Sequence, residues 1–116
     1  GLCNGIIENA LARFSVKPQD IMAWLGPAIG PSAFEVGAEV KELFCVKNGQ
    51  DKNCFVQHGD KYLANIYQLA NARLQRFGVT DISGGEYCTF SDSQRFFSYR
   101  RDGQTGRMAT VIWIDN

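Results

Sequence analysis

The sequence predicts an α/β domain with a mixed β-sheet, flanking helices and a C-terminal β-hairpin. Segments with apolar residues at helical spacing alternate along the chain with short apolar runs, in the order helix, strand, helix, weak strand, helix, strand, hairpin. The turn signal Asp102-Gly103 separates the last two extended runs. These two runs must therefore pair antiparallel, whereas the earlier crossover connections can be parallel, so we expect a mixed sheet.

Residues 1–116 fit one domain, and a hydrophobic content of 45% is enough for a packed core. The 12 basic and 12 acidic residues balance, which argues against nucleic acid or an anionic membrane as a partner. No apolar run reaches the roughly 20 residues of a membrane span, and the start lacks the features of a secretion signal. We therefore predict a cytoplasmic protein in which any anion site is local.

The first segment, Gly1 to Phe14, has apolar residues at helical spacing and predicts a helix. Its apolar stripe begins at the first residues, with only Asn4 as a late cap, so we expect further residues upstream in the natural protein.

A strand, a loop and a helix follow. Ile21 to Leu25 predicts a strand that is buried on both faces. The loop Gly26 to Pro31 leads into a predicted helix from Ser32 to about Phe44, with Ser32 and Glu35 at capping-box spacing. In α/β proteins ligands often bind at such a junction, and the helix N-terminus favours an anion. The alternative is a rigid turn before a capped helix, because the two prolines remove amide donors and no phosphate-loop motif is present.

The middle of the chain is predicted to form structural elements that support the fold. Val46 to Asn53 is polar and predicts an exposed loop that tolerates variation, and Cys54 to Gln57 predicts a short strand. Asn65 can cap a helix that runs to Phe77 and ends at Gly78 in the left-handed conformation. Val79 to Ser83 predicts another strand, after which Gly84-Gly85 allows a bend or a close backbone approach.

The four cysteines are Cys3, Cys45, Cys54 and Cys88, and no two form a CxxC pair. This spacing favours reduced thiols over a zinc ribbon, with a disulfide framework as the weaker alternative. Cys54 and His58 together supply at most two metal ligands, fewer than a metal site needs. Cys88 could act as a nucleophile only with a base nearby.

The segment from Phe96 to Arg107 concentrates aromatic rings and arginines. If Phe96 to Arg101 is a strand, Phe96, Ser98 and Arg100 share one face, and Phe97, Tyr99 and Arg101 share the other. The return strand would run from Arg107 to Ile114. Arginines around the tip of this hairpin could bind phosphate or carboxylate. The alternative is a solvated basic hairpin whose arginines stack on their aromatic neighbours.

Three segments resemble motifs of one known family. They are WLGPAIGPSAFEV from Trp24 to Val36, HGDKYLANIYQL from His58 to Leu69, and YCTFSDSQRFFSYRRDGQTGR from Tyr87 to Arg107. Together they resemble the YfiH-like, or laccase-domain, family, described first as multicopper polyphenol oxidoreductases and later as purine nucleoside phosphorylases with adenosine deaminase activity. The resemblance extends over essentially the whole chain but corresponds to the C-terminal half of a larger YfiH-like fold.

This resemblance implies a zinc centre, or a copper centre, held by two histidines and a cysteine. Gly1 resembles the last residue of the family's His-Ala-Gly-Trp-Arg-Gly motif, so the metal ligands are expected N-terminal to this chain, and no catalytic or metal-binding residue is expected within it. The implied partners are a purine nucleoside, phosphate and the N-terminal half of the same protein. Eight residues are expected near the substrate or phosphate: Gly26, Pro27, Ile29, Gly30, Ser98, Arg100, Arg101 and Arg107.

Three functions remain open at this point. The preferred one is phosphorolysis of adenosine or inosine by a zinc-dependent enzyme of which this chain is a part, with adenosine deamination as a further activity. The second is a copper-dependent polyphenol oxidase. The third is a non-catalytic module that binds an anion or a partner subunit.

Overall fold

The computed structural model describes residues 1–115 and contains two small sheets. The first is a parallel pair of strands, β1 (Met22–Leu25) and β5 (Asp81–Gly84). The second is antiparallel, with β4 (Lys61–Ala64) between β2 (Glu35–Val36) and β3 (Phe55–His58). The predicted mixture of parallel and antiparallel pairing in an α/β chain is confirmed, although it is divided between two sheets.

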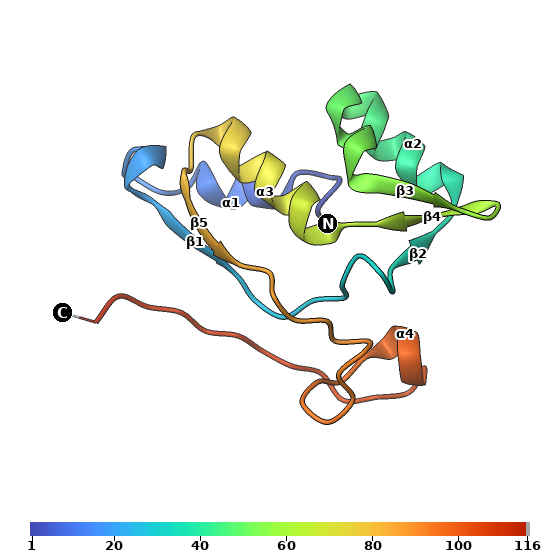
Figure 1. Ribbon diagram of the computed structural model, residues 1–116. Coiled ribbons are helices and arrows are strands. Elements are labelled where there is room, and N and C mark those ends of the chain that lie inside the picture. The colour runs from blue at the N-terminus through green and yellow to red at the C-terminus, as the bar shows by residue number, and fades with distance from the viewer. Residues whose placement is uncertain (116) are drawn as a thin grey trace.

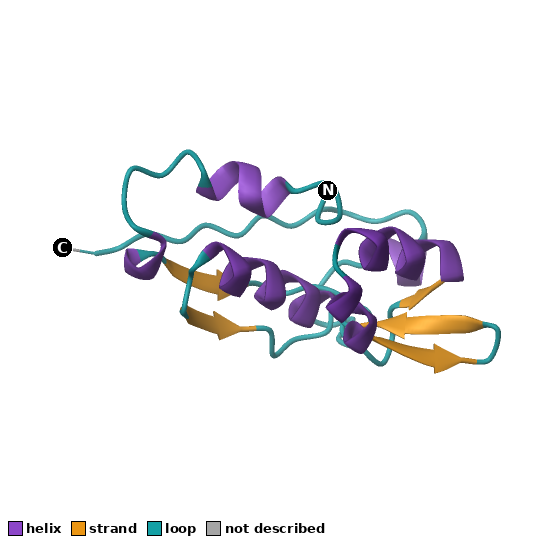
Figure 2. Ribbon diagram, turned by 90° about the horizontal axis from the view of Figure 1, so that it is seen from above, coloured by secondary structure: helices purple, strands orange, loops and turns teal. Residues whose placement is uncertain are grey.

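The helices lie mainly on one side of the sheets (Figure 1). They are α1 (Ile6–Leu11), α2 (Ala38–Lys47), α3 (Ile66–Phe77) and α4 (Tyr99–Asp102), with 3-10 turns η1 (Pro18–Asp20) and η2 (Gly49–Cys54). Helices α1 and α3 cover the parallel pair and α2 covers the antiparallel sheet, whereas α4 and the C-terminal segment lie on the opposite side. Viewed from above, the two sheets occupy opposite ends of an elongated molecule (Figure 2).

Helix α3 joins the two parts of the core. Leu69, with 1% of its surface exposed, packs in a cluster with residues of α2 and the antiparallel sheet. One turn further along α3, Leu74 packs with Leu11 of α1 and with the fully buried Val79. Burial of side chains of this size contributes roughly 1.5 to 3 kcal/mol each, so α3 is the element on which both halves of the core depend.

The prediction for α3 is confirmed at both ends. The Asn65 side chain accepts a hydrogen bond from the backbone N–H of Gln68 at 3.0 Å. Gly78 ends the helix with φ of 112°, in the left-handed region that favours glycine.

The strands that form the parallel pair lie close to where the sequence predicts them. At Gly84, φ is 87° and an added Cβ would lie 2.5 Å from the carbonyl oxygen of Leu25, so the predicted close backbone approach is confirmed. The expectation that Ile21 to Leu25 is buried on both faces is wrong, because Met22 and Trp24 are exposed on the face that α1 and α3 do not cover.

The predicted first helix is too long, since α1 contains only Ile6–Leu11. Gly5 precedes it in the left-handed conformation with φ of 88°, which prevents a continuous helix from Gly1. The predicted helix from Ser32 to Phe44 also begins too early, because residues 31–33 form a turn and Glu35–Val36 forms β2. Val36 pairs with Tyr62 of β4 and is buried, and this pairing outweighs the local capping-box signal.

The prediction of an exposed, tolerant loop from Val46 to Asn53 is wrong for Asp51. Asp51, in the 3-10 turn η2, has only 1% of its surface exposed and lies 3.3 Å from Arg76 Nη1 and 3.7 Å from Arg73 Nη2. The strand predicted at Cys54 to Gln57 is confirmed, displaced by one residue, as β3.

The predicted C-terminal hairpin is wrong. Ser98 caps the short helix α4 by accepting from the backbone N–H of Arg101 at 3.2 Å, so Phe96 to Arg101 is not a strand with alternating faces. Residues 104–115 have no strand partner among the described residues, and the apolar side chains of Val111 to Ile114 are exposed.

None of the helices among residues 1–115 is long and apolar enough to cross a membrane. All four cysteines are free thiols. The radius of gyration is 15.2 Å and the smallest extent is 20 Å, compared with a radius of about 13 Å for a compact domain of about 100 residues. The chain is therefore a flattened layer with one face covered by helices.

Candidate functional site

The loop from Gly26 to Pro31 is tied to the segment after β5. Ala28 forms a parallel bridge with Cys88, and the backbone N–H of Thr89 donates to Ala28 O at 2.9 Å. Gly30 N–H donates to the Sγ atom of Cys88 at 3.2 Å, and a Cβ on Gly30 would lie 3.1 Å from the Cβ of Cys88. The Gly30 amide, and the Ala28 amide, which donates to the Tyr67 hydroxyl, are thus occupied within the protein, which favours the rigid-turn alternative for this loop.

One hydroxyl group fixes that arrangement. The Tyr67 hydroxyl accepts from the backbone N–H of Ala28 at 2.7 Å and donates to Tyr87 O at 2.6 Å. Burial raises the pKa of Tyr67, and only part of this effect is offset by its hydrogen bond with Ala28. Tyr67 therefore stays a neutral donor and acceptor that connects α3, the loop and the segment after β5.

The thiol of Cys88 is the acceptor in this arrangement. Burial alone would raise the pKa of Cys88, but hydrogen bonds from the Ser91 hydroxyl and from the backbone N–H groups of Gly30, Ser91 and Phe90 lower it below its ordinary value. Cys88 also lines an open depression of about 480 Å³. The histidine that could act as its base bonds to Glu35 instead.

Arg101 is a structural clamp. Its Nη1 donates to Thr89 O at 2.8 Å and to Phe90 O at 3.1 Å, and its Nη2 donates to Phe96 O at 2.9 Å. Asp102 accepts from the remaining side of the guanidinium group. Because these donors are occupied, Arg101 and the buried Ser98 hold α4 in place.

Arg107 lies in the exposed C-terminal segment and lines a concavity of about 310 Å³ together with Phe97 and Tyr99. The expected contacts of Pro27, Ile29 and the arginines with a substrate stay predictions.

Arg100 reaches a different part of the molecule. Its Nη1 donates to the backbone carbonyl of Glu35 at 2.6 Å, and its guanidinium carbon lies 5.3 Å from the centre of the Phe34 ring. The side chain of Glu35 in turn accepts a hydrogen bond at 2.9 Å from Nδ1 of His58. Each of the three motif segments thus contributes one member to a polar cluster, which we call the Glu35–His58–Arg100 cluster.

Strand order explains how this cluster forms. Glu35 of β2 lies opposite Leu63 of β4, and His58 of β3 lies opposite Lys61 of β4. Positions 61 and 63 share a face of β4, so Glu35 and His58 also project from one face of the sheet. From the sequence, Glu35 is interpreted as part of a capping box and His58 as one of two potential metal ligands with Cys54. Their common membership in the motif segments was the signal that could have joined them.

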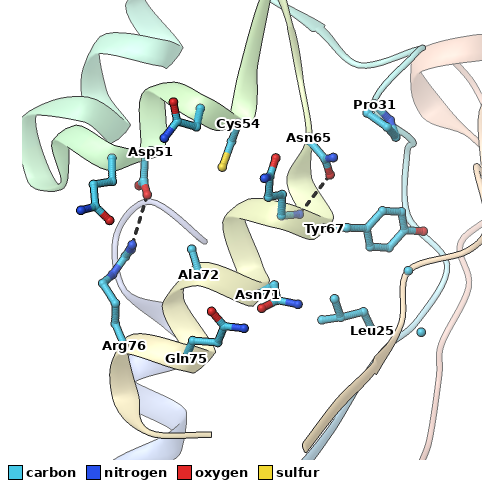
Figure 3. Close-up of a pocket in the computed structure, with 15 residues that line it drawn as sticks. Leu25, Pro31, Asp51, Cys54, Asn65, Tyr67, Asn71, Ala72, Gln75 and Arg76 are labelled. Carbon is cyan, nitrogen blue, oxygen red and sulfur yellow. Dashed lines mark hydrogen bonds and ion pairs between the residues drawn. The ribbon is translucent and has the colours of Figure 1, made fainter. Parts of the chain in front are cut away.

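A second polar feature is a cleft of about 560 Å³ between α3, η2 and the carboxyl ends of β1 and β5 (Figure 3). Asn65, Asn71 and Gln75 of the α3 region line it, and the Asp51–Arg76 ion pair lies at one side. The carboxyl ends of parallel strands are a frequent ligand position in α/β proteins, and side-chain amides can hydrogen-bond a neutral polar ligand.

Among residues 1–115, no three His, Cys, Asp or Glu side chains come together in a way that could hold a metal ion. The Glu35–His58–Arg100 cluster places a histidine, which can donate a proton, and an arginine cation at one surface.

Comparison with known proteins identifies the family. The family model described as multi-copper polyphenol oxidoreductase laccase matches residues 1–115. The chain belongs to this laccase-domain family. A relative called purine nucleoside phosphorylase YfiH, from Shigella flexneri, is 57% identical over 114 residues, which are 98% of this chain and 47% of the relative. A purine nucleoside phosphorylase of Haemophilus influenzae is 52% identical over 119 residues, 99% of this chain and 48% of the relative.

Solved structures of laccase-domain relatives share the fold. A protein of Neisseria meningitidis aligns with a TM-score of 0.86 and 43% identity, covering 89% of this chain and 43% of that protein. A YfiH protein of Bacillus licheniformis aligns with a TM-score of 0.73 and 25% identity, covering 87% of this chain and 39% of that protein. The chain spans about half the length of the curated relatives it matches.

Proposed function

We propose that the whole protein to which this chain belongs is a purine nucleoside phosphorylase that cleaves adenosine or inosine with phosphate. The single observation that carries this proposal is the 57% identity, over 98% of the chain, to a relative with that name. Adenosine deamination is a further activity of the same proposed enzyme. The expected location is the cytoplasm.

The proposed cofactor is zinc, with copper as the alternative, and its ligands belong to a part of the protein that precedes this chain. The chain would contribute a wall of the site through the Gly26 to Pro31 loop and the segment from Ser98 to Arg107. Arg100 and Arg107, which are exposed, are the available cations for phosphate, because the donors of Arg101 are occupied by carbonyl oxygens.

The N-terminal half of the same protein is the proposed partner of this chain. Val111 to Ile114 are exposed and extended, and Met22 and Trp24 are exposed on the nearby uncovered face of the parallel pair. Thr110 would lie 3.5 Å from a Cβ placed on Gly26, so the C-terminal segment passes beside the end of β1. An additional layer of the protein would bury these apolar surfaces.

The test uses the full-length protein with inosine or adenosine, with and without inorganic phosphate, and separates the free base chromatographically. We expect base to be released only when phosphate is present, together with an equal amount of ribose 1-phosphate. A folded, metal-loaded protein that releases no base would refute phosphorolysis. Oxygen-dependent oxidation of a phenol that requires copper would instead favour the polyphenol oxidase suggested by the family description.

A further inference from the structure

We propose that His58, held by Glu35, is the proton donor to the purine base as the glycosidic bond breaks. This inference rests on the proposed phosphorolysis and deepens it, because it assigns a residue of this chain to the leaving-group side of the reaction. Its basis is the geometry of the Glu35–His58–Arg100 cluster.

The histidine is oriented by one nitrogen and open at the other. Nδ1 donates to Glu35 Oε2 at 2.9 Å, which fixes the ring orientation and leaves Nε2 without a hydrogen-bond partner among the described residues. The side chain of His58 is 60% exposed, so Nε2 is accessible to a ligand. A carboxylate that holds one ring nitrogen while the other faces the reacting atoms is a recurrent arrangement for acid–base catalysis by histidine.

The backbone of Glu35 is itself fixed on two sides. Glu35 belongs to β2, whose backbone pairs with β4, and its carbonyl oxygen accepts the 2.6 Å hydrogen bond from Arg100. Arg100 also stacks over Phe34, the residue before Glu35. The dyad therefore rests on a sheet and on α4 instead of a free loop, as a positioned catalytic group requires.

The charged groups around His58 come from β2, β4, α4 and the turn between β3 and β4. Glu35 faces it from β2, Lys61 lies opposite it on β4, and Asp60 lies in the turn that joins β3 to β4. Arg100 of α4 hydrogen-bonds to the backbone carbonyl oxygen of Glu35. Glu35 and the two cations are the groups placed to face an imidazolium ring and a phosphate dianion, whereas no hydrogen bond or ion pair joins Asp60 to the dyad among the described residues.

The proposed step balances with phosphate as the co-reactant. An oxygen of hydrogen phosphate forms a bond to C1′ of the ribose, and the bond from C1′ to N9 of the purine breaks with its electron pair moving into the base. His58 gives the proton on Nε2 to that base, and the proton carried by hydrogen phosphate restores His58. The products are the neutral base and ribose 1-phosphate, with no net gain or loss of protons.

The alternative is that the Glu35–His58 pair is an exposed surface interaction without function. Such pairs are common and contribute about 0 to 1 kcal/mol to stability. A substrate that needs no protonation distinguishes the two. The base of 7-methylinosine already carries a positive charge and leaves as a neutral molecule without accepting a proton. Loss of a proton donor therefore lowers kcat for inosine and not for 7-methylinosine, whereas loss of a structural residue lowers kcat for both nucleosides equally.

The experiment compares the full-length wild-type protein with His58→Gln, His58→Gly and Glu35→Gln on both nucleosides. The matched control is Asp60→Asn, which removes one negative charge from the same hairpin without touching the dyad. We expect His58→Gln to lower kcat for inosine by about 10² to 10⁴ and to change kcat for 7-methylinosine by less than about threefold. Added imidazole should restore inosine cleavage by His58→Gly.

Glu35→Gln should lower kcat for inosine by about tenfold with little change in KM, because it affects orientation and not binding. Asp60→Asn should stay within about twofold of the wild type. The assignment is overturned if His58→Gln cleaves inosine like the wild type, if it loses both substrates to the same extent, or if imidazole restores nothing. An inactive wild-type protein would refute the proposed function itself, so the two failures are distinguishable.

Discussion

Asp51→Asn is expected to destabilise the protein strongly, although Asp51 lies in a segment that looks like a tolerant loop. The side chain is 1% exposed and interacts with Arg76 at 3.3 Å and with Arg73 at 3.7 Å, and Arg73 is itself only 4% exposed. Removal of one partner of a buried ion pair costs about 3 to 5 kcal/mol. Asparagine keeps the volume, so no cavity forms. Glu8 still bonds Arg73 at 2.9 Å, and we therefore expect the lower end, about 3 kcal/mol.

Urea unfolding of the full-length protein, followed by circular dichroism, measures this loss. With a slope of about 2 kcal/mol per molar urea, a loss of about 3 kcal/mol lowers the midpoint by about 1.5 M. Asp60→Asn is the matched control, because it makes the same chemical change at an exposed turn and should stay within about 0.5 kcal/mol of the wild type. If Asp51→Asn unfolds at the same urea concentration as Asp60→Asn, the buried carboxylate does not stabilise the fold and our reasoning is wrong.

Three further predictions concern α3 and the loop beside it. Asn65→Ala removes the side-chain cap of α3 and should cost about 1 kcal/mol in the same unfolding assay; no loss would mean that the cap is redundant. Tyr67→Phe removes the hydroxyl that joins Ala28 and Tyr87 and should speed amide hydrogen exchange at Ala28, with unchanged exchange there as the contrary result. Iodoacetamide should alkylate Cys88 half-maximally at a lower pH than Cys54, because hydrogen bonds lower the pKa of Cys88 whereas burial raises that of Cys54. Peptide mass spectrometry distinguishes the two thiols, and the reverse order would contradict the hydrogen-bonded thiol of Cys88.

The sequence predicts α3 well because every signal for it is local. The cap at Asn65, the apolar face and the glycine at position 78 all lie within the helix or next to it. The helix predicted from Ser32 fails because its competitor is not local: Val36 pairs with Tyr62, 26 positions further along the chain. A capping-box pattern cannot reveal such a pairing.

The candidate site is less accessible to sequence reasoning than the fold. Glu35 of β2 and His58 of β3 lie on either side of β4, and their side chains form a hydrogen bond across one face of the sheet. This strand order cannot be read from either segment alone. The hairpin predicted at the C-terminus fails because the Ser98 hydroxyl and the Arg101 guanidinium satisfy local backbone groups and favour a short helix. The composition of Arg107 to Ile114 indicates a strand, but residues 1–115 provide no strand that pairs with it.

The open C-terminal segment affects how this chain can be handled in the laboratory. Its backbone N–H and C=O groups are unpaired across residues 108–115, a run that includes Val111, Ile112 and Trp113, and this combination readily adds strands from other molecules. Expressed on their own, residues 1–116 should self-associate into β-rich aggregates. Coexpression with the proposed N-terminal half, or fusion to it, is therefore the appropriate route to well-behaved material.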